Sequence, residues 1–117
     1  MSELAELWGI YRGLNIILQK GMQEVLIESD ADQMVQWIVG ETPSNCPQRA
    51  LLEDTKFLLD RCKCSLVSIS CEGTKCADSL ANLGVNHKEP LVVFEDPPAQ
   101  IVSLLIADMV GLSCERA

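Results

Sequence analysis

The sequence has few of the residues on which several kinds of functional site depend. Its 117 residues include one histidine, two tryptophans, one tyrosine and two phenylalanines. The chain has nine Lys and Arg residues and 17 Asp and Glu residues, so its formal net charge is -8. Because nucleic acids and anionic membranes are themselves polyanions, this balance disfavours nonspecific electrostatic binding to either. It does not exclude a metal site built from carboxylates.

A targeting signal and a long apolar run are also missing. The start, MSELAELWGI, carries two glutamates where a secretory signal carries Lys or Arg. We therefore expect an intracellular protein, in the nucleus or the cytoplasm. The most apolar stretch, residues 99–110, is interrupted by Gln100, Ser103 and Asp108. It is shorter than the roughly 20 residues that a helix needs to cross a bilayer, so we expect no membrane-spanning segment.

The cysteines fit no common metal or disulfide pattern. The sequence has no CxxC pair, and His87 is its one histidine. Without a secretory signal, reduced thiols are the better default, and a zinc site is the minority interpretation. We expect His87 at the surface. The cysteines expected to be buried or chemically neutral are Cys46, Cys62, Cys64, Cys71, Cys76 and Cys114.

The length and a hydrophobic content of 48% indicate one small globular domain. Leucines and aromatic residues recur every three or four positions from residue 2 to residue 20, which predicts an amphipathic helix that ends before Gly21. The residues expected on its inward face are Leu4, Leu7, Trp8, Tyr11, Leu14 and Leu18.

Two short β-prone segments are separated by helical ones. Residues 24–28 are typical of a strand covered on both faces, and residues 65–70 alternate as a second strand. Asp30 and Gln33 fit a capping box, which predicts a helix over residues 31–39. That helix is expected to bury Met34, Val35 and Ile38.

Further helices are expected on both sides of the second strand. One spans residues 49–61, with inward positions Leu51, Leu52, Thr55, Leu58 and Leu59. Another runs from Lys75 to Leu83 and is closed by Gly84, with Cys76, Leu80 and Leu83 on one face. Residues 91–94 predict a short extended strand, and a last amphipathic helix follows the prolines at 97 and 98, with Ile101, Leu104, Leu105, Asp108 and Met109 continuing it.

Strands joined through helices are expected to be parallel, with a right-handed crossover. Two strands make too small a sheet for the apolar helix faces predicted above. Either another chain completes the sheet, or part of the domain is missing from this chain.

Three segments carry a resemblance to a known family. They read AELWGIYRGL from residue 5, VLIESD from residue 25 and CADSLANLG from residue 76. In this order and at these separations they resemble the ribonuclease H type 1 family, and most closely its plant branch associated with reverse transcriptase-like elements. The resemblance covers about residues 3–86, and residues 91–98 are also similar to that branch.

The resemblance implies an α/β fold in which a five-stranded mixed sheet is flanked by helices. This sequence starts at the first helix of that fold. We therefore expect a ribonuclease H-like fold with a truncated mixed sheet, whose parallel strands lie at about residues 23–29 and 64–70. Residues 1–86 would form the domain without its opening β-meander. Residues 87–117 would form a tail with a short strand and an amphipathic helix.

The resemblance also implies a chemistry. Enzymes of the family cleave the RNA strand of RNA–DNA hybrids with two Mg²⁺ ions held by carboxylates. Carried over by motif, the catalytic and metal-binding residues here are Glu6, Asp30 and Asp78. The family's fourth carboxylate has no counterpart, and the position of its loop histidine falls at about Ser68, which cannot titrate near neutral pH. We expect weakened Mg²⁺ binding and impaired cleavage.

Each carboxylate also has an ordinary explanation. Glu6 can be a solvated helix residue, Asp30 an N-cap, and Asp78 a first-turn acid favoured by the helix dipole. Two alternatives to a nucleic-acid-binding domain therefore stay open. One is a noncatalytic domain that recruits a protein partner through the tail helix or an open sheet edge, and the other is an unstable fragment.

Overall fold

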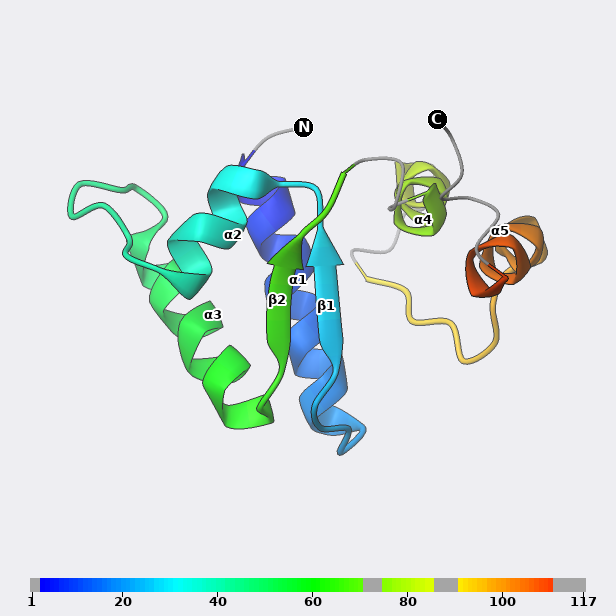
Figure 1. Ribbon diagram of the computed structural model, residues 1–117, viewed down its shortest axis with the longest axis horizontal. Coiled ribbons are helices and arrows are strands. Elements are labelled where there is room, and N and C mark those ends of the chain that lie inside the picture. Colours follow the sequence, from blue (N-terminus) through cyan, green and yellow to red (C-terminus); the bar gives the residue numbers. More distant parts are fainter. Residues whose placement is uncertain (1–2, 71–74, 86–90, 111–117) are drawn as a thin grey trace. The chain divides into compact units, whose positions relative to one another are not determined.

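The computed structural model describes residues 3–70, 75–85 and 91–110 (Figure 1). Contacts divide the chain into two compact units, residues 1–69 and residues 70–117. The first unit contains α1 (Glu3–Gln19), β1 (Leu26–Ser29), α2 (Asp32–Val39), α3 (Arg49–Cys62) and β2 (Ser65–Ser68). The second contains α4 (Lys75–Val85) and α5 (Ala99–Met109). The order of helices and strands predicted for the first unit is confirmed.

The two strands form a parallel sheet, which confirms the predicted α/β class. Ile27 lies opposite Leu66 in the register, and both side chains face the helices of this unit. The next residues along each strand point the other way, because side chains alternate across a sheet. On that face Leu26 is 57% exposed and Val67 is 38% exposed. The expectation that the first strand is covered on both faces is therefore wrong.

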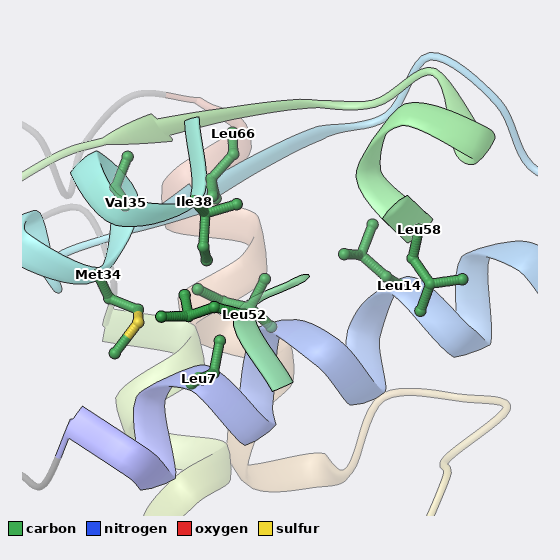
Figure 2. Packing of buried hydrophobic residues seen from close by; sticks show 9 residues of the cluster. Leu7, Leu14, Met34, Val35, Ile38, Leu52, Leu58 and Leu66 are labelled. Carbon is green, nitrogen blue, oxygen red and sulfur yellow. The ribbon is translucent and has the colours of Figure 1, made fainter. Parts of the chain in front are cut away.

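The core of the first unit lies where α1, α2 and α3 pack against one another and against the sheet. Figure 2 shows side chains from the three helices gathered between α1 and the sheet. The cluster consists of Leu7, Ile10, Leu14, Met34, Val35, Ile38, Leu52, Leu58 and Leu66. Aliphatic side chains of this kind contribute about 1.5–3 kcal/mol each when fully buried, so the cluster is the main source of stability in this unit.

The buried face of α1 was predicted in part: Leu7 and Leu14 are buried as predicted, and Tyr11 packs partly buried against the core. Exposed fractions of 39–45% place Leu4, Trp8 and Leu18 at the surface. The buried positions are Leu7, Ile10, Leu14 and Ile17. Both sets repeat every three or four residues, so periodicity fits them equally well. The second set contains only aliphatic side chains, and it is the one that faces α2 and α3.

The start of α2 also differs from the prediction. Its N-cap is Ala31, with no side-chain cap, so the capping box of Asp30 and Gln33 is not formed. Instead the Ser29 hydroxyl accepts a hydrogen bond from the Ala31 N–H at 3.1 Å. The Asp30 carbonyl oxygen accepts one from the Asp32 N–H at 3.0 Å. The predicted burial of Met34, Val35 and Ile38 is confirmed.

The third helix lies as predicted. Leu52, Thr55 and Leu58 are buried, and Leu51 and Leu59 pack partly buried against the core. The Thr55 hydroxyl, which is fully buried, donates a hydrogen bond to the Leu51 carbonyl oxygen at 2.8 Å. This bond allows a polar side chain to lie inside the core without an unmet donor.

In the second unit, α4 and α5 pack against each other. The helix α4 continues through Gly84 to Val85, so the predicted stop at Gly84 is wrong. Cys76 and Leu83 are half-buried, whereas Leu80 is exposed. None of the residues described in α4 is fully buried.

The strand predicted at residues 91–94 is absent from the structure. These residues have no regular secondary structure. The helix α5 begins after Pro98, as predicted. Ile101 is buried at its start, and Met109 is exposed at its end. In the part of the chain that the structure describes, no helix is both long enough and apolar enough to cross a membrane.

Further expectations fall on residues outside the described ranges, and among them is the predicted burial or neutrality of Cys71 and Cys114. The boundary predicted between residues 86 and 87 lies in the segment 86–90, and so does His87. All of these stay predictions.

Candidate functional site

Two of the three predicted site residues belong to the first unit. Glu6 lies in the first turn of α1 and is half-buried. Asp30 is exposed and directly follows β1, in the turn that leads into α2. The Asp32 N–H donates a hydrogen bond to the Asp30 carbonyl oxygen. This bond turns the chain immediately after β1 and so positions Asp30.

These two carboxylates lie at the same end of the first unit. Figure 1 shows that α1 begins at the end of the unit at which both strands finish. The carboxyl ends of parallel strands are where α/β folds commonly place functional groups. Glu6, Asp30 and the exposed Ser68 at the end of β2 therefore belong to one end of this unit.

Asp78 belongs to the second unit. It lies in the first turn of α4 and is exposed. The three predicted site residues are thus divided between two units, each described by itself. Within the described ranges, no three His, Cys, Asp or Glu side chains form a group that could hold a metal ion.

The donor chemistry of the predicted set suits a hard cation. Carboxylate oxygens are the ligands that Mg²⁺ prefers, and it takes few of them while keeping several waters. Glu6 and Asp30 supply two such groups at one end of the first unit. The resemblance assigns the third to Asp78.

A cluster that the sequence prediction missed lies along α1, where Trp8 and Arg12 are exposed and Tyr11 is half-buried against the core. The rings of Trp8 and Tyr11 meet edge to face, with centroids 5.5 Å apart and an interplanar angle of 85°. The Arg12 guanidinium carbon lies 5.5 Å from the centroid of the Trp8 ring. The spacing of three and four residues was the available signal. The predicted inward position of Trp8 obscures it, whereas the predicted inward position of Tyr11 is confirmed, because Tyr11 packs partly buried against the core.

This cluster has the chemistry of a stacking surface. An exposed aromatic ring offers a face to a nucleic-acid base, and an arginine beside it offers a donor to a phosphate. Trp8 is exposed, and so is Arg12. The arrangement places an aromatic and a basic group together on a chain that is acidic as a whole.

The described cysteines, Cys46, Cys62, Cys64 and Cys76, carry free thiols. Burial raises the pKa of the Cys76 thiol, and the nearby Asp108 carboxylate raises this pKa further. Since the thiolate is the nucleophile and the metal ligand, a raised pKa makes Cys76 a poor candidate for either role at neutral pH.

Comparison with known protein families identifies a match. The family model described as reverse transcriptase-like matches residues 1–84. The matched range holds the whole first unit and nearly all of α4, and it includes Glu6, Asp30 and Asp78. No curated protein and no solved structure matches the chain.

Proposed function

This chain belongs to the reverse transcriptase-like family, which is ribonuclease H-like, and on that premise we propose that it is a nucleic-acid-binding domain of ribonuclease H type 1 descent. The activity of that descent is Mg²⁺-dependent cleavage of RNA in RNA–DNA hybrids, and we propose that it is impaired here. The plant branch and an intracellular location are part of the proposal. The observation that carries it is the match over residues 1–84, which contains all three predicted carboxylates.

In this proposal Glu6, Asp30 and Asp78 hold Mg²⁺ through their carboxylate oxygens. The ion, when bound, would polarise a phosphate and make a bound water more acidic. The common position of Glu6 and Asp30 at one end of the first unit supports the assignment. The impairment rests on Ser68, which stands where the family pattern has an imidazole.

Binding is tested with the purified full chain and labelled nucleic acids of one sequence. The RNA–DNA hybrid, the DNA duplex, the RNA duplex and single-stranded RNA are each titrated, with and without Mg²⁺, and fluorescence anisotropy reports binding. We expect saturable binding of the hybrid. Because A-like helices are recognised through shape and 2′-hydroxyl groups, we expect weaker binding of the DNA duplex. Absence of binding to every nucleic acid would overturn the proposal.

Cleavage is followed in the same samples by gel electrophoresis. We expect the hybrid to stay intact or to be cut only slowly. The informative variants are Asp30→Asn and Asp78→Asn, and Glu53→Gln is the matched control, because Glu53 is exposed on α3. Rapid Mg²⁺-dependent cleavage that Asp78→Asn abolishes and Glu53→Gln preserves would show that the activity is not impaired.

A second candidate function is that of a protein-interaction domain. It is favoured by the exposed apolar face of the two-stranded sheet, where Leu26 and Val67 lie. Sedimentation of the full chain over a range of concentrations tests self-association through this face. A monomer that behaves identically to the Leu26→Thr variant would count against self-association.

A further inference from the structure

The end of α3 brings two cysteines close together. The helix ends at Cys62, and Lys63 then adopts a left-handed backbone conformation with φ 56° and ψ 40°. The chain enters β2 at Ser65. The Cys64 N–H donates a hydrogen bond to the Leu59 carbonyl oxygen at 3.2 Å, which holds Cys64 against the last turn of the helix.

The Cys64 side chain packs against Cys62. The Cys64 thiol lies 3.6 Å from the Cys62 carbonyl oxygen, to which it donates a hydrogen bond. Burial raises the pKa of the Cys62 thiol, and the neighbouring Cys64 thiol raises this pKa further, as expected for two thiols that lie near each other. A CxC spacing does not by itself ensure this contact, because residues two apart along a strand also lie on one face without bonding to each other. The reversal at Lys63 produces it.

The two thiols differ in their access to solvent. Cys62 is 3% exposed, and its thiol donates a hydrogen bond to the Leu14 carbonyl oxygen on α1, with 3.9 Å between sulfur and oxygen. Cys64 is half-buried at the edge of the core cluster. A small oxidant therefore reaches Cys64 first, whereas Cys62 is placed to react with whatever forms there.

We propose that Cys62 and Cys64 are an oxidative modification site, a dithiol that hydrogen peroxide converts to an intramolecular disulfide. The Cys64 thiolate attacks one peroxide oxygen, so an S–O bond forms, the O–O bond breaks, and the departing hydroxide takes a proton to leave as water. The Cys62 sulfur then attacks the sulfur of the Cys64 sulfenic acid as the Cys62 proton passes to the departing hydroxide, and because burial raises the pKa of Cys62 this is the slower step at neutral pH. The S–S bond forms, the S–O bond breaks, and a second water leaves.

Hydrogen peroxide is the only oxidant that this disulfide formation requires. Two thiols lose two hydrogen atoms and two electrons, and one hydrogen peroxide becomes two waters. The product changes the packing of the first unit as well. Once its sulfur is in the disulfide, Cys62 has no thiol hydrogen to donate to Leu14, so a link between the end of α3 and α1 is lost.

The test uses the full chain carrying Cys71→Ser. The chain is treated with hydrogen peroxide, its remaining thiols are blocked, and it is digested with trypsin without reduction. Cleavage after Arg61, Lys63 and Lys75 releases Cys62 and Cys64 on separate peptides. In this variant an intramolecular disulfide that joins these two peptides links Cys62 to Cys64. We expect mass spectrometry to find the joined pair, and dithiothreitol to separate it.

Two variants and one condition complete the test. Cys64→Ser abolishes the joined pair. Cys46→Ser preserves it, because Cys46 bonds to Gln48 in a different part of the unit. The pair forms more slowly in urea, where the fold no longer holds the thiols together. The proposal is overturned if peroxide carries Cys64 to sulfinic acid without a joined pair or leaves both thiols intact, or if the unfolded chain forms the pair as fast as the folded one.

Discussion

On α1, a buried leucine and an exposed leucine lie four positions apart. Leu14 is fully buried between the helices, whereas Leu18 is 39% exposed. We expect Leu14→Ala to lower the free energy of unfolding by about 2–5 kcal/mol, because the substitution removes apolar surface that is buried on folding and leaves a cavity. We expect Leu18→Ala to lower it by less than about 1 kcal/mol. Urea unfolding followed by tryptophan fluorescence measures both. Equal losses would show that the outer face of α1 is also covered.

The buried thiol of Cys62 gives the stability of the first unit a dependence on pH. Burial raises the pKa of Cys62, the neighbouring Cys64 raises it further, and Arg61 partly opposes the change. The folded state therefore holds this proton more tightly than the unfolded state does. The protonated Cys62 thiol contributes fully to the free energy of unfolding below the thiol pKa of the unfolded chain, which is about 8.5. This contribution is lost as the pH rises through the raised pKa of the folded state.

We accordingly expect the free energy of unfolding to fall between about pH 8 and pH 10 under reducing conditions. The Cys62→Ala variant should be less stable at pH 7, but its stability should change less with pH over this range. Guanidinium titrations of both proteins at each pH measure the effect. Parallel pH profiles for the two proteins would contradict the assignment to Cys62.

At the scale of single elements, the stop of α3 depends on an unusual backbone conformation. Lys63 is in the left-handed region, with its N–H bonded to the Asp60 and Leu59 carbonyl oxygens. A residue with a Cβ costs about 1–2 kcal/mol there, whereas glycine has no such cost.

We expect Lys63→Gly to raise the free energy of unfolding by up to about 1 kcal/mol, since the extra freedom of glycine in the unfolded chain offsets part of the gain. Lys63→Ala is the matched control, because it removes the charged side chain and keeps the Cβ. Thermal unfolding of both variants under identical conditions provides the comparison. A gain shared by Lys63→Ala would point to the lysine charge instead of the backbone.

The elements themselves could be predicted because their signals are local. Apolar periodicity and turn residues located α1, α3 and both strands, and the α2 core positions were correct. The inward face of α1 was predicted only in part, with Leu7 and Leu14 correct, because two stripes share one period and only the packing of α2 and α3 decides between them. The cap of α2 failed for a related reason. Ser29, at the end of β1, holds the Ala31 N–H and leaves the Asp30 and Gln33 pattern unused.

The predicted site depends on a different kind of information. Glu6, Asp30 and Asp78 were found through motifs, and each has an ordinary local explanation. The N-cap explanation for Asp30 is wrong, since Ala31 occupies that position. The contact between Cys62 and Cys64 was accessible in part, because the CxC spacing is visible in the sequence. The left-handed turn at Lys63 was not visible, because lysine rarely adopts it.

For the whole molecule, the distribution of buried side chains implies two levels of stability. The first unit has fully buried leucines at positions 7, 14 and 52. In the second unit α4 has no fully buried residue, and Ile101 is the one buried position among the described residues of α5. Local opening free energies follow buried apolar contact, so the helices of the two units should open differently.

We expect the backbone amides of α1 and α3 to exchange hydrogen only through global unfolding of the first unit, and those of α4 to exchange through smaller openings. Hydrogen–deuterium exchange of the full chain, read on peptides from each helix, measures this difference. Leu14→Ala provides the control, because it destabilises the core of the first unit. It should speed exchange in α1 and α3 and leave α4 unchanged. If α4 exchanges as slowly as α1, and if Leu14→Ala accelerates both alike, then the two units unfold as one cooperative body.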